Sequence, residues 1–134
     1  MTYAIAAALQ EAVFTRISTD PGVIALVGSA IYDALPSGSL PATYVTLGPE
    51  QARDRSDQTA RGAEHDFVLS VNTELAGFAS AKAVAAALND ALFAGPLTLA
   101  RGRLVALNFL RAQARLDGAI RRIEIRFRAR VDDI

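Results

Sequence analysis

The 134-residue sequence has no cysteine and no tryptophan, and it contains a single histidine. The absence of cysteine excludes a thiol nucleophile, a disulfide framework and a zinc site built on thiolates. No apolar run approaches the ~20 residues that a membrane-spanning helix needs. The first basic residue is Arg16, so the charged start of a secretory signal is missing. We therefore expect a soluble protein with no membrane partner and no cofactor.

The chain is rich in apolar residues: 51% of its residues are hydrophobic and 21% are charged. A chain of this length buries roughly two thirds of the surface that it exposes when unfolded. A chain of this length can therefore form a hydrophobic core without a disulfide or a structural metal. The sequence predicts one domain over residues 1–134.

The formal net charge is zero, but the charges are unevenly distributed along the chain. Residues 101–130 carry a net charge of +7, and residues 1–100 carry −5. Almost all of the basic residues are arginine, which favours planar and partly desolvated pairing over mere solubility. Such polarity favours contact with copies of the same chain or with neighbours of opposite charge.

Apolar spacing predicts helices over 2–18, 21–27 and 77–93, and alternation predicts strands over 31–32, 43–47 and 65–71. Thr2 is expected to cap the first helix, and Asp20 followed by Pro21 is expected to start the second. Residues 50–63 have no large apolar side chain, so a long flexible loop is expected there. The predicted fold is α+β: an antiparallel or mixed sheet of about four to five strands with two main helices on one face.

The last third of the sequence predicts a long C-terminal hairpin, because Asp117-Gly118 separates two alternating runs. With these two residues as the turn, Leu110 and Ala112 face the core opposite Ile125 and Ile123. The same register places Asn108 and Ala106 on the core face, opposite Phe127 and Ala129. On the other face it sets three apolar residues against three arginines: Phe109, Leu107 and Val105 against Arg126, Arg128 and Arg130. An arginine face over apolar side chains suits a protein interface.

The one cluster with catalytic residue types is Glu64-His65-Asp66. On a strand, His65 points away from both acidic neighbours, so no ligands converge and a histidine at a strand edge is the simpler interpretation. The carboxylates Asp54, Asp57, Glu64 and Asp66 flank the polar loop without a calcium-loop spacing. No serine nucleophile motif or phosphate loop is present, so we predict neither catalytic nor metal-binding residues.

The order of short segments resembles the tail-completion, or tail-terminator, family of long-tailed phages, prophages and gene transfer agents. The segments that carry the resemblance are Ile31-Tyr32-Asp33-Ala34-Leu35-Pro36, Leu40-Pro41-Ala42-Thr43-Tyr44-Val45-Thr46-Leu47-Gly48, Gly62-Ala63-Glu64-His65-Asp66-Phe67-Val68-Leu69-Ser70-Val71, Gly77-Phe78-Ala79-Ser80-Ala81-Lys82 and Ile125-Arg126-Phe127-Arg128-Ala129. The resemblance covers nearly the whole chain. The alanine-rich composition and the arginine bias resemble the gene-transfer-agent branch.

The resemblance implies a non-enzymatic α+β subunit that forms a hexameric ring on the last ring of the tail tube. Such a ring stops tube growth and presents a surface to the head-tail connector proteins. The implied partners are further copies of the chain, the major tail tube protein and the connector, with DNA passing through the lumen without sequence-specific binding. The implied locations are the host cytoplasm during assembly and then the tail of a phage-like particle.

The expected contact surfaces are the polar loop and the hairpin. Their residues are Arg53, Asp54, Arg55, Asp57 and Arg61 in the loop, and Val105, Leu107, Phe109, Arg122, Arg126, Arg128 and Arg130 in the hairpin.

Two other functions stay open at this point. One is a nucleic-acid-binding module that uses the arginine-rich hairpin, although Phe127 lies on the core side and leaves no stacking platform. The other is a small metal-assisted hydrolase built around Glu64, His65 and Asp66.

Overall fold

The computed structural model describes residues 3–57 and 61–133. Within them lie three helices, α1 (Ala6–Thr19), α2 (Pro21–Val27) and α3 (Ala79–Leu92). The strands are β1 (Ile31–Tyr32), β2 (Thr43–Asp54), β3 (Arg61–Thr73), β4 (Arg103–Asp117) and β5 (Ile120–Asp133). None of the helices in this described part has the length and apolar character needed to span a bilayer.

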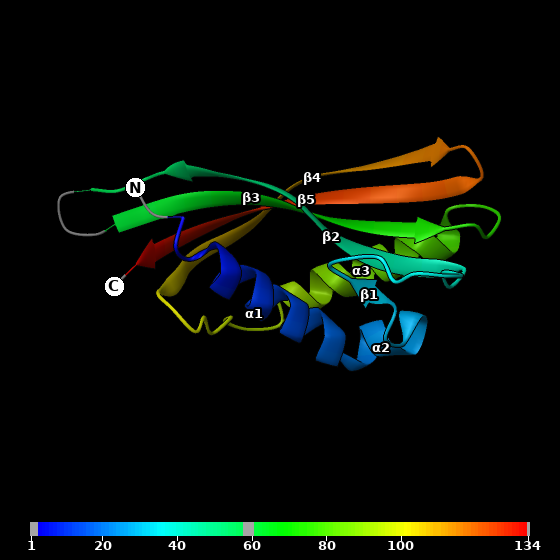
Figure 1. Ribbon diagram of the computed structural model, residues 1–134, viewed down its shortest axis with the longest axis horizontal. Helices are drawn as coiled ribbons and strands as arrows, with labels where there is room; N and C mark the ends of the chain where they lie inside the picture. The colour runs from blue at the N-terminus through cyan, green and yellow to red at the C-terminus, as the bar shows by residue number, and fades with distance from the viewer. Residues whose placement is uncertain (1–2, 58–60, 134) are drawn as a thin grey trace.

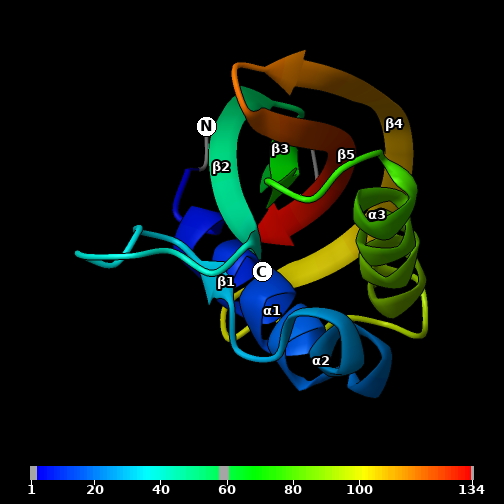
Figure 2. The same ribbon diagram turned by 90° about the vertical axis from the view of Figure 1, so that its right-hand side faces the viewer.

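The strands form one mixed sheet in the order β1-β2-β3-β5-β4. The short β1 is parallel to β2, and all other neighbours in the sheet are antiparallel. All three helices lie on one side of this curved sheet and leave its other face open (Figures 1 and 2). The predicted α+β class with a long C-terminal hairpin is confirmed.

The core lies between the helices and the covered face of the sheet. Alternate residues of β3 and β5 point into it, and Phe127 at its centre is fully buried, 5.5 Å from the Phe67 ring between centroids. The residues four apart on α1, Ile5, Leu9, Val13 and Ile17, are all buried. The apolar spacing in the sequence therefore identified the buried side of these elements.

The helix boundaries follow local capping chemistry only in part. The Asp20 carboxylate accepts a hydrogen bond from the Val23 amide at 3.1 Å, Pro21 occupies the first turn, and Gly28 ends α2 with a φ of 59°, as predicted. By contrast α1 begins at Ala6 after Ile5, with no side-chain cap. The expected cap Thr2 lies outside the described residues.

The expected loop over 50–63 is largely a β-hairpin. Strand β2 continues to Asp54 and β3 starts at Arg61, with Arg53 paired to Glu64 and Asp54 to Ala63. The hairpin persists without large apolar side chains because backbone pairing is supported by ion pairs such as Arg53–Glu64. Residues 58–60, which belonged to the expected loop, lie outside the described residues.

The predicted register of the C-terminal hairpin is wrong. Its turn is Gly118-Ala119, because Asp117 already pairs with Ile120. Gly118 has a φ of 63° at the first loop position, where a two-residue turn of type II′ places glycine. The ladder therefore starts two positions away from the predicted pairing.

Two register shifts, between Leu104 and Ala106 and between Phe109 and Arg111, then change which face the β4 side chains occupy. Phe109 pairs with Phe127 and Leu107 with Ala129, so neither lies opposite an arginine. The open face instead receives Ala106 and Asn108, opposite Arg130 and Arg128. The predicted apolar stripe beneath the arginines therefore does not exist, and neither do the predicted core positions of Ala106 and Asn108.

Candidate protein interfaces

The open face of the sheet carries a layer of arginine–carboxylate pairs. Glu64 on β3 meets Arg53 Nη2 at 2.8 Å and Arg55 Nε at 3.2 Å. Asp66, two residues further along, accepts a forked pair from Arg128, with Nε–Oδ1 at 2.8 Å and Nη2–Oδ2 at 3.0 Å. This geometry is the strong bidentate form of the interaction.

These pairs shift the titration of the groups involved. The Arg128 hydrogen bonds hold the pKa of Asp66 below its ordinary value, and the same contact raises the pKa of Arg128. For Glu64, desolvation on burial raises the pKa, but the hydrogen bonds from Arg53 and Arg55 outweigh it and the net pKa is lowered. These contacts therefore favour the ionised forms of Glu64, Asp66 and Arg128.

The rest of the arginine row is also largely paired within the chain. Arg122 donates to Asn72 Oδ1 at 2.7 Å and to Asp117 Oδ2 at 3.0 Å, and Arg115 Nη2 lies 3.1 Å from Glu124. Arg130 Nη2 donates to the Arg55 carbonyl oxygen at 3.3 Å. From the sequence we expected these arginines to contact a partner, whereas in the structure most of them are already paired within the chain.

One part of this face departs from the pattern. Arg111 on β4 lies directly opposite Arg126 on β5. Like charges in directly opposed positions destabilise a strand pair. Both guanidinium side chains border a small pocket over the buried Val68, which Gln113 and Glu124 also line. Arg126 is thus one of two members of the predicted arginine set that face another arginine, since Arg122 lies opposite Arg115.

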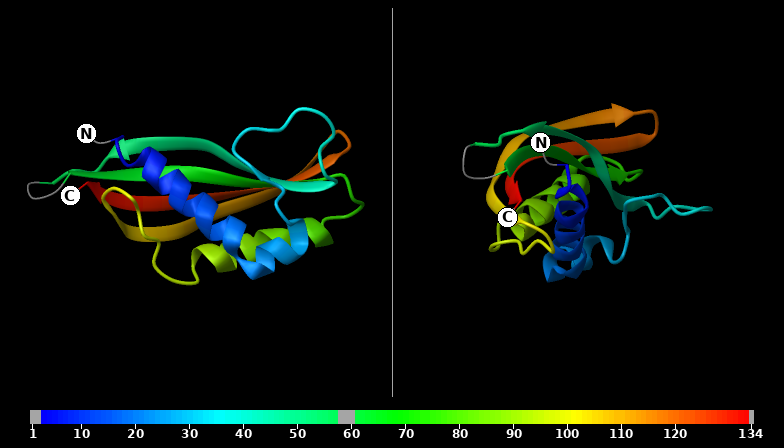
Figure 3. Two further views of the ribbon diagram at one scale, coloured as in Figure 1. Left: turned by 60° about the horizontal axis from the view of Figure 1, so that its bottom comes forward. Right: turned by 60° about the vertical axis from the view of Figure 1, so that its left-hand side comes forward.

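The predicted contact residues at the β2–β3 end are placed as follows. Asp54 Oδ1 accepts hydrogen bonds from the Ser56 hydroxyl at 2.7 Å and the Ser56 amide at 3.2 Å, which lower the pKa of Asp54. Asp57 follows Ser56 and is exposed, and Arg61 opens β3 opposite Asp133. This hairpin projects from the same end of the molecule as both chain termini (Figure 3). On the open face this hairpin nevertheless adjoins the β4–β5 hairpin, because Arg130 donates to the Arg55 carbonyl oxygen.

His65 is not at a strand edge as the sequence suggested, since Ala52 and Ala129 flank it on the two neighbouring strands. Its side chain is 0% exposed, and Nδ1 lies 3.6 Å from Glu50 Oε2. Glu64 and Asp66 point to the other face, as predicted. In the described part of the chain no group of three histidine, aspartate or glutamate residues is arranged to hold a metal ion. Nothing there converges on a hydrolytic centre.

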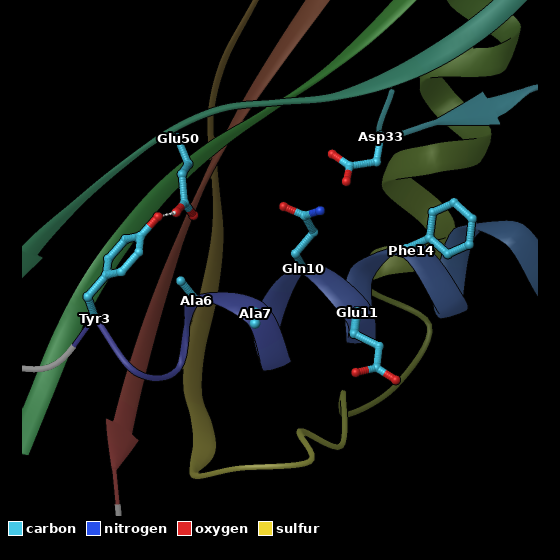
Figure 4. A pocket seen from close by; sticks show the side chains of 8 residues that line it. All are labelled: Tyr3, Ala6, Ala7, Gln10, Glu11, Phe14, Asp33 and Glu50. Atoms are coloured by element: carbon cyan, nitrogen blue, oxygen red, sulfur yellow. Dashed lines mark hydrogen bonds between the residues drawn. The ribbon is translucent and has the colours of Figure 1, made fainter. Parts of the chain in front are cut away.

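An acidic pocket of about 500 Å³ lies between α1 and β2 (Figure 4). Its lining includes the carboxylates of Glu11, Asp33 and Glu50, and no basic residue lines it. The Tyr3 hydroxyl donates a hydrogen bond to Glu50, and this contact raises the pKa of Tyr3. The pocket is a negatively charged recess on the β1–β2 side of the molecule.

Residues 33–42, which we call the arm, connect β1 to β2 and project away from the body of the protein (Figures 2 and 3). Within the arm, the Leu35 side chain is 53% exposed, and Gly38 has a φ of 90°. Such a positive φ is readily adopted only by glycine, which permits the chain to reverse there.

The opposite side of the molecule carries an apolar groove of about 540 Å³ between α3 and β4, which we call the α3–β4 groove. Its principal lining residues are Ala85, Ala86, Phe93, Phe109 and Ala112. Phe93 and Phe109 are 44% and 51% exposed, and β4 is exposed along nearly all of its length. Exposed apolar area beside an edge strand, whose outer side has no neighbouring strand, is typical of a contact surface.

One of the predicted interface residues lies in this groove, although the groove itself was not predicted from the sequence. Phe109 is one of its walls, while Val105 lies at the register shift and is about half-exposed. Leu107 is partly buried against the core instead. The available signal was the run of small alanines on α3 followed by Phe93, from which the sequence predicted a helix but no groove beside it.

Comparisons with known proteins agree with the fold and with the absence of a catalytic centre. A family model described as tail completion protein gp17 matches residues 11–132. A comparison with curated proteins gives no match. A solved chain described as belonging to the virion of a native gene transfer agent (GTA) particle is 57% identical, with a TM-score of 0.92. The match covers 98% of this chain and 99% of that chain.

These matches confirm the resemblance inferred from the order of segments. They also confirm a structural protein rather than an enzyme, because the matched family is one of structural tail completion proteins. The chain belongs to the tail completion protein gp17 family.

Proposed function

We propose that this chain is a tail terminator, which closes the tail tube of a gene-transfer-agent-like particle as a hexameric ring and joins the tube to the head-tail connector. The observation that carries the proposal is the 57% identity with a chain of a GTA virion, over nearly the whole length of both chains. Its partners are then further copies of itself, the major tail tube protein and the connector proteins.

The surfaces of the molecule support a ring rather than a twofold dimer. A closed ring is built from one contact between two different patches on each copy. The arm and the acidic pocket lie on the β1–β2 side, and the α3–β4 groove lies on the β4 side. The chain thus carries two unlike surfaces at opposite edges of one sheet.

Two measurements test this function. Purified protein examined by light scattering should move from monomer toward hexamer as concentration rises, and negative-stain images should show rings. Cells that produce particles without this chain should release tails of uncontrolled length or tails without heads. A stable dimer built on one self-complementary patch, or normal particles without the chain, would contradict the proposal.

The nucleic-acid alternative has the opposed arginine pairs in its favour, Arg111 with Arg126 and Arg115 with Arg122. Three of the hairpin arginines of the open face, Arg128, Arg122 and Arg115, are paired with Asp66, Asp117 and Glu124, which reduces the positive charge available to bind phosphates. A nucleic-acid-binding module would show affinity for duplex DNA that falls steeply between 50 and 200 mM salt. We expect weak binding, in keeping with DNA that slides through a lumen.

A further inference from the structure

The arm exposes apolar residues that its own chain does not cover. Leu35 is more than half exposed, and Pro36 and Pro41 restrict the backbone on either side of the turn. A segment that is already restrained loses little conformational entropy on binding. The arm therefore has the properties of a preformed projection rather than of a loose connection.

The α3–β4 groove has the complementary shape and chemistry. The alanines Ala85 and Ala86 leave space above α3, and Phe93 and Phe109 form apolar walls. Asn89 is the polar residue in its lining. An aliphatic side chain such as leucine fits this environment, because it would bury apolar area without leaving a polar group unpaired.

The arm and the groove cannot meet within one molecule. The arm leaves the body beyond β1 and β2, whereas α3 and β4 form the far side in the same view (Figure 2). An arm that occupies the groove would therefore belong to a second copy of the chain. Such a contact between unlike surfaces repeats from copy to copy.

Charge favours the same pairing of edges. The acidic pocket beside the base of the arm contributes Glu11, Asp33 and Glu50. Strand β4 carries three arginines and one acidic residue, Asp117; Arg103 and Arg115 contact Asp132 and Glu124, whereas Arg111 lies opposite Arg126. An edge with excess carboxylates thus faces an edge with excess arginines when copies join head to tail.

We propose that the arm of one copy docks in the α3–β4 groove of the next copy, with Leu35 seated between Phe93 and Phe109. This inference rests on the ring proposed above and identifies the two surfaces that form its repeating contact. A side chain that anchors such a groove typically contributes a large share of the binding free energy.

Because the chain has no cysteine, thiol cross-linking can test the contact at chosen positions. We would introduce Leu35→Cys together with Ala86→Cys and treat assembled particles with a thiol-reactive cross-linker of about 8 Å span, longer than the ~6 Å between Cα atoms that a disulfide needs. Denaturing gels should show a ladder extending to six copies. An equal mixture of the two single variants should stop at dimers, since each copy then has one thiol.

The matched control is Leu35→Cys combined with Ala100→Cys, an exposed position in the α3–β4 connection but outside the groove lining. It should give no ladder.

A second pair of variants tests the Leu35 anchor itself. Leu35→Asp should reduce incorporation into particles roughly tenfold or more, and Leu35→Met should leave it within about twofold.

Each outcome decides a different point. If particles contain the chain but neither Ala85→Cys, Ala86→Cys nor Ala112→Cys cross-links to Leu35→Cys, the arm–groove contact is wrong and the ring stands. Efficient cross-linking of Leu35→Cys to itself, or normal incorporation of Leu35→Asp, also overturns the contact. If the wild-type chain is missing from the particles, the proposed function fails and this inference fails with it.

Discussion

Strands β3 and β4 flank β5 on its two sides, and they differ sharply in burial. Nearly all of β3 after its first residue is buried or half-buried, whereas almost every residue of β4 is exposed. Both strands pair with β5 along their length, β3 without interruption and β4 with two register shifts. Strand β3 has a neighbouring strand on each side, whereas β4 has a neighbouring strand on one side only and leaves its other edge open.

This contrast separates two kinds of information in an alternating sequence. Alternation predicts that a strand forms and which residues share a face. It does not say whether that face is covered by the same chain or by a partner. The predictions below test how much β3 and β5 contribute to the free energy of unfolding and how much β4 contributes to contacts between copies.

The largest effect is expected from Phe127→Ala on β5. The ring is fully buried against Phe67, so its loss should lower the free energy of unfolding by about 3–5 kcal/mol. The partner change Phe109→Ala should cost only about 1 kcal/mol, because half of that ring is already exposed. Urea denaturation of both variants measures the difference. Equal losses would show that β4 is as well packed as β5.

A smaller effect of opposite sign is expected from His65→Leu on β3. Both ring nitrogens of His65 are buried without a hydrogen-bond partner among the described residues. Replacing an unsatisfied buried polar group by an apolar one of similar size should raise the free energy of unfolding by about 1 kcal/mol. Thermal unfolding checks this. A large destabilisation would mean that the contact with Glu50 stabilises the fold.

A still smaller, pH-dependent effect is expected from Arg128→Gln. Because Arg128 lowers the pKa of Asp66 below its ordinary 3.8, the stabilisation is fully present above that value. It is lost as the pH falls through the lowered pKa. The variant should therefore be less stable than the wild type at pH 7, and the difference should shrink as the pH falls below 3.8. Arg126→Gln is the control, and removal of its like-charge opposition to Arg111 should not destabilise the protein.

The smallest effect on stability is expected from Leu116→Lys at the end of β4. Leu116 is well exposed, so the free energy of unfolding should change by less than about 0.5 kcal/mol. Lysine on an edge strand opposes strand-to-strand pairing, so self-association in light scattering should decrease. Leu75→Lys, another exposed leucine outside β4, should leave self-association unchanged.

Much of the fold could be predicted because local rules agreed with the packing. The residues four apart on α1 and the alternation around Phe127 directly marked the covered face of the sheet. The Asp20-Pro21 start of α2 needed no tertiary information either, because the cap and the proline act within one turn.

The parts that could not be predicted depend on contacts distant in sequence. The register shifts at Val105 and Leu110 arise where β4 bends to follow the curved sheet, and no pattern of residues in the sequence predicts them. The extension of β2 to Asp54 depends on Arg53 meeting Glu64, a polar pairing that an apolar pattern cannot reveal. The α3–β4 groove was missed because it exists only once α3 lies beside the edge strand.

The position of β5 between β3 and β4 also has a kinetic consequence. Thr73 pairs with Arg121 and Arg61 with Asp133, partners 48 and 72 positions apart. Sheets built from such distant pairings fold slowly, on millisecond to second scales, because loop closure must precede the stabilising contacts. Until β5 is in place, the β2–β3 hairpin and β4 have no common neighbour. The β2–β3 and β4–β5 pairings are local hairpins, so the distant β3–β5 pairing that joins them is the step that completes the sheet.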